Sequence, residues 1–141
     1  MKQLSNNLSD DACILTAKNS YLGKKMSKYA HGKFYVMEEI CAYAAKNGDL
    51  EMLKYAHENG CIWDEWVCAI AALGGYLQVL KYAHENGCKW DKDTCMSAAL
   101  NGHLEILKYA RENGCEWHKN RCERVAIHNN HTNIVEWIKN N

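Results

Sequence analysis

The sequence predicts an all-α protein: a single domain, residues 1–141, built from tandem copies of one two-helix unit. Three observations support this prediction. A 27-residue pattern recurs through most of the chain, and proline, the residue that most often breaks helices, does not occur in it. Within each copy, apolar residues are spaced as on one side of a helix. Repeats of this length are typical of proteins in which similar units stack side by side.

The repeat is clearest in three segments that are almost identical. They start at Leu50, Leu77 and Leu104, and each ends in Asn-Gly-Cys. An Ala-Ala pair precedes each segment and a tryptophan follows it, both at the same 27-residue step. Altered copies at the two ends complete about five units, and these end units are expected to act as caps. The approximate units are 10–36, 37–63, 64–90, 91–117 and 118–141.

Start and stop signals place two helices in each unit. In the unit 91–117 we expect a first helix at 91–100, with Asp91 capping its unpaired N–H groups. We expect a second helix at 104–112, ended by Asn113-Gly114, because glycine easily adopts the left-handed conformation that terminates helices. Isolated helices this short are unstable in water, so their apolar sides must be buried between stacked units. The Lys-Tyr pairs of the second helices are expected to form a solvated rib, at 54–55, 81–82 and 108–109.

The unit resembles the ankyrin repeat. In that family an Ala-Ala pair, a Gly-His dipeptide and a closing glycine mark the helix–turn–helix, and the pattern here reads Ala98-Ala99-Leu100-Asn101-Gly102-His103 and then Asn113-Gly114-Cys115. The resemblance covers nearly the whole chain and implies an ankyrin-like solenoid of about five repeats. It also implies that the first helices line a concave face that holds a protein partner. The variant is similar to short ankyrin-like repeats of large DNA viruses of amoebae, which implies a viral protein.

One departure from the family affects the expected shape. The unit has 27 residues, whereas ankyrin repeats have about 33. The missing residues fall mainly between Gly87 and Thr94, where the family carries a β-hairpin finger. We therefore expect the fingers to be reduced or absent.

The balance of charge excludes several kinds of partner. Lysine and arginine together number 17, aspartate and glutamate also number 17, and the net charge is zero. Nucleic-acid binding needs a basic surface, and so does attraction to an anionic membrane, so neither is expected. No apolar run reaches the roughly 18 residues of a membrane span, and the first residues do not resemble a secretory signal. We expect a protein of the cytoplasm, or of the host cytoplasm if it is viral.

Eight cysteines raise the possibility of metal or redox chemistry. A structural zinc site needs four converging ligands, usually including a close Cys-x-x-Cys pair, and the sequence has no such pair. Equivalent residues on stacked helices lie about 8–10 Å apart, which is also too far for a disulfide between equivalent cysteines. We expect reduced, buried thiols and neither metal nor cofactor, with metal binding and a redox switch as alternatives.

Positions that differ between the copies are candidates for function, since the repeated positions maintain the fold. Trp66, Ile70 and Leu73 have the spacing i, i+4, i+7 and share one side of a first helix. Tyr43 and Leu100 should flank them on neighbouring units. Clusters of exposed aromatic and aliphatic residues are typical of protein interfaces. These five residues are the predicted partner-binding site, although Trp66 could instead pack against the turn of its neighbour.

Three functions remain as hypotheses. The first is a non-enzymatic protein-binding module, a monomer or weakly self-associating, that uses the first-helix face. The alternative is a structural or self-assembling solenoid, and the third is a metal-binding regulator. An enzyme is not expected, because the sequence has neither a Gly-x-Ser-x-Gly elbow nor a phosphate-binding glycine loop.

Overall fold

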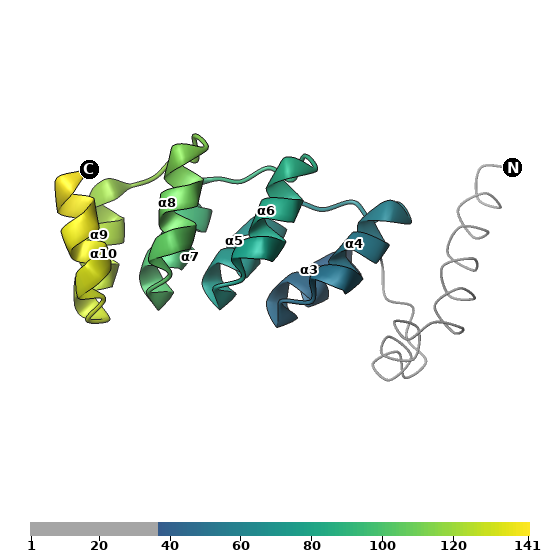
Figure 1. Ribbon diagram of the computed structural model, residues 1–141, viewed down its shortest axis with the longest axis horizontal. Helices are drawn as coiled ribbons and strands as arrows, with labels where there is room; N and C mark the ends of the chain where they lie inside the picture. The colour runs from purple at the N-terminus through teal and green to yellow at the C-terminus, as the bar shows by residue number, and fades with distance from the viewer. Residues whose placement is uncertain (1–36) are drawn as a thin grey trace, which may run out of the picture.

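The computed structural model describes residues 37–141, and the first expected unit, 10–36, lies outside the described residues. Within 37–141 the chain forms eight α-helices and no β-strand, which confirms the all-α prediction for this part. The helices, in chain order (Figure 1), are α3 (Met37–Asn47), α4 (Leu50–Glu58), α5 (Glu65–Gly74), α6 (Leu77–Glu85), α7 (Lys92–Asn101), α8 (Leu104–Glu112), α9 (Lys119–His128) and α10 (Thr132–Asn140).

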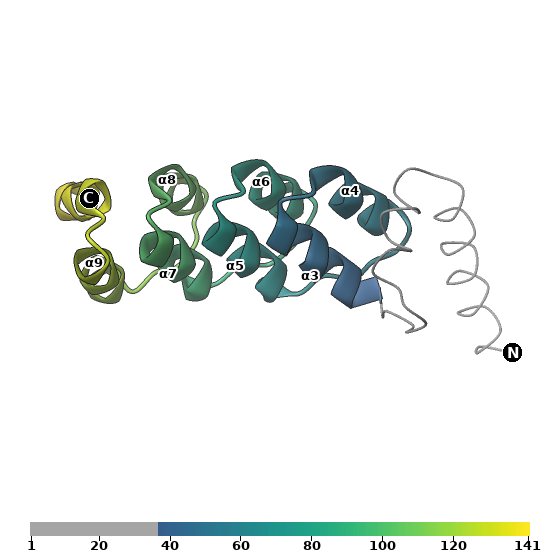
Figure 2. The same ribbon diagram turned by 90° about the horizontal axis from the view of Figure 1, so that it is seen from below.

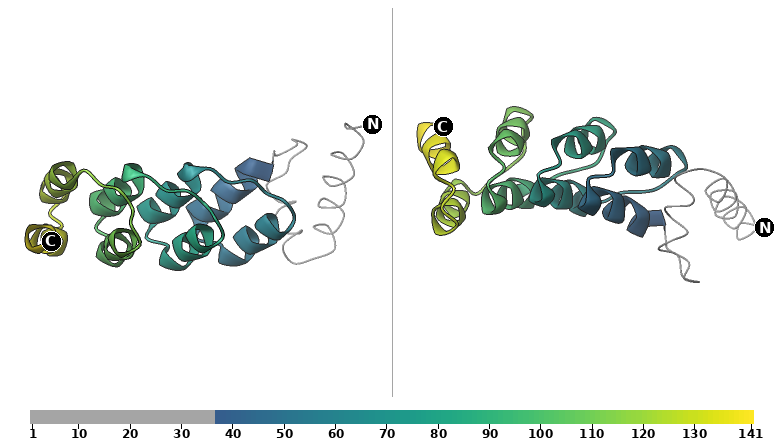
Figure 3. Two further views of the ribbon diagram at one scale, coloured as in Figure 1. Left: turned by 90° about the horizontal axis from the view of Figure 1, so that it is seen from above. Right: turned by 60° about the horizontal axis from the view of Figure 1, so that its bottom comes forward.

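Consecutive helices pair into four hairpins within the described residues: α3 with α4, α5 with α6, α7 with α8, and α9 with α10. The hairpins lie in a row in the order of the sequence. Two layers result, as Figure 2 shows: the first helices α3, α5, α7 and α9 contact one another in sequence, and the second helices line up beside them. The two views of Figure 3 show the same two layers from other sides. An inner hairpin is therefore packed against a neighbour on either side.

Aspartate side chains begin the middle first helices, as the sequence predicts. The Asp64 Oδ1 atom accepts a hydrogen bond from Trp66 N at 3.1 Å, and Asp91 Oδ1 accepts one from Asp93 N at 2.8 Å. Helix α7 thus begins one residue later than expected, with Asp91 as its cap outside the helix. The second helix of the same unit has the expected bounds.

The Asn-Gly-Cys sequence ends each of the helices α4, α6 and α8 in the same way. At the end of α6, Asn86 Nδ2 donates to Tyr82 O at 2.8 Å, and Gly87 takes a left-handed φ of 90°. The chain then turns so that Cys88 N donates to Ala83 O at 2.9 Å. This arrangement of bonds satisfies the last free carbonyls of the helix. It also directs the Cys88 side chain into the core, where it is buried.

Small side chains form the core between the first helices. In α7, Cys95, Ala98 and Ala99 are fully buried, and their counterparts in α5 are buried too. Each of α4, α6 and α8 adds a fully buried leucine: Leu53, Leu80 and Leu107. Short side chains let neighbouring helix backbones approach closely, since the distance between packed helices depends on the side chains at the contact.

An aromatic cluster links neighbouring second helices, and the sequence did not predict it. The Trp63 ring stacks on His57 with centroids 3.8 Å apart, and the ring of Tyr82 in the next unit meets Trp63 edge-on at 6.1 Å. Lys54 Nζ lies 5.9 Å from the centre of the Tyr82 ring. The expected solvated Lys-Tyr rib is therefore wrong for this tyrosine, which is half-buried between two units.

The cluster recurs in the later units with one substitution. Trp90 stacks on His84 at 3.5 Å and meets Tyr109 of the following unit at 6.0 Å. Where the histidine is replaced, the Arg111 guanidinium lies 4.7 Å from the centre of the Trp117 ring. A planar guanidinium stacks on an aromatic face as an imidazole does, so the exchange preserves the contact.

Glycines in the helix turns make room for rings of the next unit. A Cβ atom added to Gly75 would lie 2.6 Å from the His103 ring, and one added to Gly102 would lie 2.7 Å from the His131 ring. Both glycines have a φ of 80°. The rings therefore rest directly on the backbone of the preceding turn, which is a contact that only glycine permits.

The turn between α9 and α10 explains why the last unit is out of step with the 27-residue repeat. It contains one residue more than the corresponding turn between α7 and α8. Asn130 takes the left-handed φ of 60° that Gly102 takes in the preceding unit, where φ is 80°. Asparagine is among the few non-glycine residues that tolerate this conformation. The extra residue therefore lengthens the turn, so α9 keeps the 27-residue step from α7 while α10 follows α8 by 28 residues.

The expectation that all cysteines are reduced is wrong for one pair. Cys41 and Cys61 form a disulfide, with Cα atoms 6.7 Å apart. Equivalent cysteines of neighbouring units are too far apart for a disulfide, whereas this bond joins two different positions of one unit. Cys41 lies on the first helix and Cys61 follows the second, and the hairpin brings them together. The other five cysteines within 37–141 are buried free thiols.

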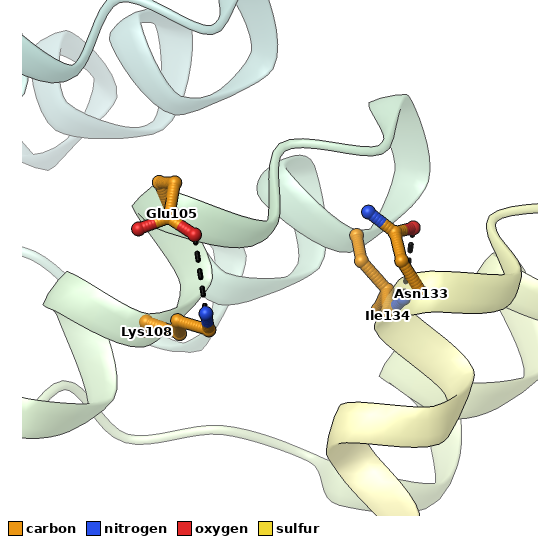
Figure 4. Close-up of polar contacts among 4 residues, drawn as sticks. All are labelled: Glu105, Lys108, Asn133 and Ile134. Carbon is orange, nitrogen blue, oxygen red and sulfur yellow. Dashed lines mark hydrogen bonds and ion pairs between the residues drawn. The ribbon is translucent and has the colours of Figure 1, made fainter.

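Surface ion pairs contribute little by comparison. In the described part they are Lys54 with Glu51 at 3.7 Å and Lys108 with Glu105 at 3.1 Å, both between exposed side chains on one helix. Figure 4 shows the second pair, together with the Asn133 side chain that accepts a hydrogen bond from Ile134 N at the start of α10. Such helical ion pairs contribute about 0.3–0.5 kcal/mol each. Apolar packing within and between hairpins must therefore supply most of the stability.

We predict that Gly75→Ala destabilises the protein more than Gly114→Ala does. The two glycines have nearly the same φ, 80° and 82°, but nothing lies within 4 Å of a Cβ atom at Gly114. The left-handed conformation should cost about 1–2 kcal/mol at either site, and overpacking against His103 should add about 1–3 kcal/mol at Gly75. Urea unfolding of both variants measures the difference. Equal losses would mean that the ring contact contributes nothing.

Candidate partner-binding surface

The structure separates the five predicted site residues by exposure. Trp66 is 60% exposed, Leu73 is 39% exposed and Leu100 is 38% exposed. Ile70 and Tyr43 are instead half-buried and pack against the core. Trp66 lies in the first turn of α5 and Leu73 in its last turn, which places their backbones about 10 Å apart along the axis. On α5 the predicted cluster is thus exposed at its two ends, Trp66 and Leu73, and half-buried between them at Ile70.

Two of the exposed residues, Leu73 and Leu100, belong to a longer row of apolar side chains that has a third member. Leu73, Leu100 and Ile127 occupy the same position of α5, α7 and α9, each one repeat after the one before. Ile127 is 55% exposed and was not among the predicted residues. The 27-residue step that relates the other two would have identified it. We call Leu73, Leu100 and Ile127 the apolar row.

A shallow hollow of about 640 Å³, widely open to solvent, lies at the α9 end of the apolar row. Leu100, Val125 and Ile127 form its apolar part, and Arg121 and Arg124 border it. Both arginines are exposed, and neither forms an ion pair with any residue from 37 to 141. An apolar depression with unpaired guanidinium groups at its edge can bury an apolar side chain and bind carboxylates beside it.

Side chains from the following unit hold the helix ends at Leu73 and Leu100 in place. Asn101 Nδ2 donates to Leu73 O at 2.8 Å, and His103 Nε2 donates to the same oxygen at 3.1 Å. His131 Nε2 donates to Leu100 O at 3.0 Å. Since a carbonyl oxygen only accepts, Nε2 of each histidine carries the proton. These bonds fix the ends of α5 and α7, so Leu73 and Leu100 are held in place before any partner binds.

Within 37–141, no three His, Cys, Asp or Glu side chains gather in a group that could hold a metal ion. Among the same residues, no helix combines the length and apolar character needed to cross a membrane.

The comparisons with known proteins do not assign a family. No family model matches the chain, and no curated protein matches it significantly. The resemblance to ankyrin repeats therefore rests on the residues quoted above.

We predict that Trp66 and Ile70 differ sharply in their effect on stability. Trp66→Ala should change the free energy of unfolding by less than about 0.5 kcal/mol, because the side chain is mostly exposed. Ile70→Ala should cost about 1–2 kcal/mol, because its side chain packs against the core. Thermal and urea unfolding of the two variants measures both values. A large loss of stability in Trp66→Ala would show that Trp66 is a packing residue and not part of a binding surface.

Proposed function

We propose that this protein is a non-enzymatic binding module that holds a protein partner against the apolar row. The observation that carries the proposal is the row itself: three large apolar side chains exposed at one repeated position of neighbouring helices. Scattered exposed apolar residues are normal on a soluble protein, whereas a contiguous group marks an interaction surface. The partly exposed Trp66 extends this surface along α5, and tryptophan is prominent among residues that dominate binding energy.

The proposal includes an ankyrin-like solenoid in which the first helices line the concave, partner-facing side. The two-layer row of hairpins supports it, as do the Gly-His contacts between consecutive turns. The short segments after Cys61, Cys88 and Cys115 contain no strand, which agrees with fingers that are reduced or absent. Binding would then depend on the helices and not on fingers.

The edge of the surface favours a partner with acidic groups beside its apolar side chains. Arg121 and Arg124 border the hollow and have no partner carboxylate among the described residues. An arginine that meets a carboxylate in a site partly shielded from water gains more than an exposed pair does. An apolar side chain in the hollow, flanked by Asp or Glu, would satisfy both kinds of lining residue.

Self-assembly through stacking of hairpins is the alternative, and one comparison weighs against it. Val67 in α5 and Thr94 in α7, two inner first helices, are buried. The equivalent residue of α9 is Arg121, which is exposed. Covering it with another hairpin would bury a charge without a partner, which is strongly unfavourable. Light scattering distinguishes the alternatives, since assembly requires oligomers that grow with concentration. A metal-binding regulator remains the third proposal, and metal analysis of the purified protein tests it.

A selection from a random peptide library displayed on phage tests the proposed function on the full chain. We predict that the wild type selects peptides in which an aliphatic or aromatic residue is flanked by Asp or Glu. Ile127→Asp should weaken their binding at least about tenfold, because it puts a charge into the apolar row. Ile62→Asp is the matched control, since Ile62 is 73% exposed but lies between α4 and α5, outside the row.

The possible outcomes test the apolar row and the preference for acidic partners separately. Equal binding by the wild type and Ile127→Asp, or no selected peptide, would contradict the proposed surface. Loss of binding in Ile127→Asp with no effect of Arg121→Glu and Arg124→Glu would support the apolar row and reject the acidic partner. Circular dichroism of each variant verifies that the helices remain.

A further inference from the structure

Six of the cysteines form three pairs with one spacing. Cys41 and Cys61 have a sequence separation of 20, and the pairs Cys68 with Cys88 and Cys95 with Cys115 repeat it. In every pair the first cysteine lies on the first helix of a hairpin, and the second follows the second helix of the same hairpin. The first pair is joined by a disulfide. The repeat therefore places two further pairs of thiols in the same relation.

The fold brings the members of these two pairs close together. Cys68 Sγ lies 4.0 Å from the carbonyl oxygen of Cys88, and a side-chain hydrogen bond between the thiols changes the pKa values of both members of each pair. The second cysteine of each pair also bonds to the preceding loop: Cys88 Sγ lies 3.2 Å from Asp64 O, and Cys115 Sγ lies 3.1 Å from Asp91 O. All four side chains are buried. Both pairs are thus held close by the fold.

The contact makes the two thiols of a pair unequal. The hydrogen bond from Cys68 lowers the pKa of Cys88, since it stabilises the Cys88 thiolate. The same bond, together with burial, raises the pKa of Cys68. The pKa values of Cys115 and Cys95 differ in the same directions for the same reason. The cysteine that follows the second helix is therefore the better nucleophile of each pair.

We propose that Cys68–Cys88 and Cys95–Cys115 are disulfide-forming sites equivalent to Cys41–Cys61, oxidised by a small-molecule disulfide such as oxidised glutathione. The Cys88 thiolate attacks one sulfur of the oxidant, and one glutathione leaves as its thiolate. Cys68 then loses its proton and attacks the Cys88 sulfur of the mixed disulfide, which releases the second glutathione. The protein loses two protons and two electrons for each bond, and the oxidant is reduced to two glutathione molecules. Cys115 and Cys95 take the corresponding parts.

Cys122 provides an internal control. It occupies the first-helix position of the last hairpin, and the residues described for that hairpin include no second cysteine. Burial raises the pKa of its thiol to about 11. The proposal therefore requires Cys122 to stay reduced when both pairs are oxidised.

The test is refolding of the full chain from its reduced, unfolded state in buffers of graded reduced and oxidised glutathione. Refolding gives the oxidant access to thiols that the native fold buries. Free thiols are then alkylated, and the linked peptides are identified by mass spectrometry without reduction. We expect Cys68 linked to Cys88, Cys95 linked to Cys115, and Cys122 alkylated. Alkylation of all four paired cysteines at every redox ratio, or linkage in other combinations such as Cys88 with Cys95, would overturn the proposal.

Thermal unfolding provides a second readout that does not depend on identifying the linked peptides. Each bond closes a loop within one hairpin and should raise Tm by on the order of 10 °C relative to the reduced protein. The quantity compared is the oxidised-minus-reduced difference in Tm within each variant, so a general effect of serine on folding cancels. Cys88→Ser should lose part of this difference, and Cys122→Ser should retain all of it. An unchanged difference in Cys88→Ser would contradict the assigned pair.

Discussion

Contact between neighbouring hairpins is the constraint on which the rest of this structure depends. Each second helix within 37–141 has nine residues, and helices of this length are unstable alone in water. Each second helix packs against the first helix of its own hairpin, and further contacts join it to a neighbouring unit. Examples are the His103 ring over Gly75, the Tyr82 ring against Trp63, and the Nε2 bond from His103 to Leu73 O. Because the units contribute equivalent groups, with substitutions such as Arg111 for histidine and Tyr76 at Gly48, similar contacts recur along the row. Stability then depends on neighbours more than on any single unit.

This constraint also determines which residues are available for function. The positions that repeat without change are occupied in packing, as the buried alanines and cysteines of the first helices are. The exposed ends of α5 and α7 are held by hydrogen bonds from the next unit to backbone oxygens, which require no particular side chain at Leu73 or Leu100. Lys46 fills this position in α3, and the apolar row fills it in the later helices. The stack therefore presents a surface whose shape is fixed and whose chemistry is free to vary.

The sequence predicted the helices well because their start and stop signals are local. Asp91 begins a helix and Asn113-Gly114 ends one through contacts within a few residues. The stacking of His57 on Trp63 was not predicted, since it depends on how the chain folds back after the helix. The Cys41–Cys61 bond was missed for a similar reason: spacing arguments compared equivalent positions, and the hairpin joins different ones.

The candidate site was predicted only in part. Helical spacing correctly placed Trp66 and Leu73 on one side of α5, but it could not show that Ile70 lies at the boundary of the core. Ile127 was missed because only the second half of the last unit departs from the 27-residue step, and this could not be located without the structure. The extra residue falls after α9, at the turn of Asn130, so the 27-residue step still holds at Ile127.

Hydrogen exchange of a core variant tests most directly whether the hairpins depend on one another. Leu80 is fully buried in α6, and Leu80→Ala should cost about 2–5 kcal/mol. If stability resides in the contacts between units, amide exchange followed by mass spectrometry will show protection falling in α8 as well as in α6, although the sequence of α8 is unchanged. A loss of protection confined to α6 and its own hairpin would contradict the account, because it would mean that the units are stable independently.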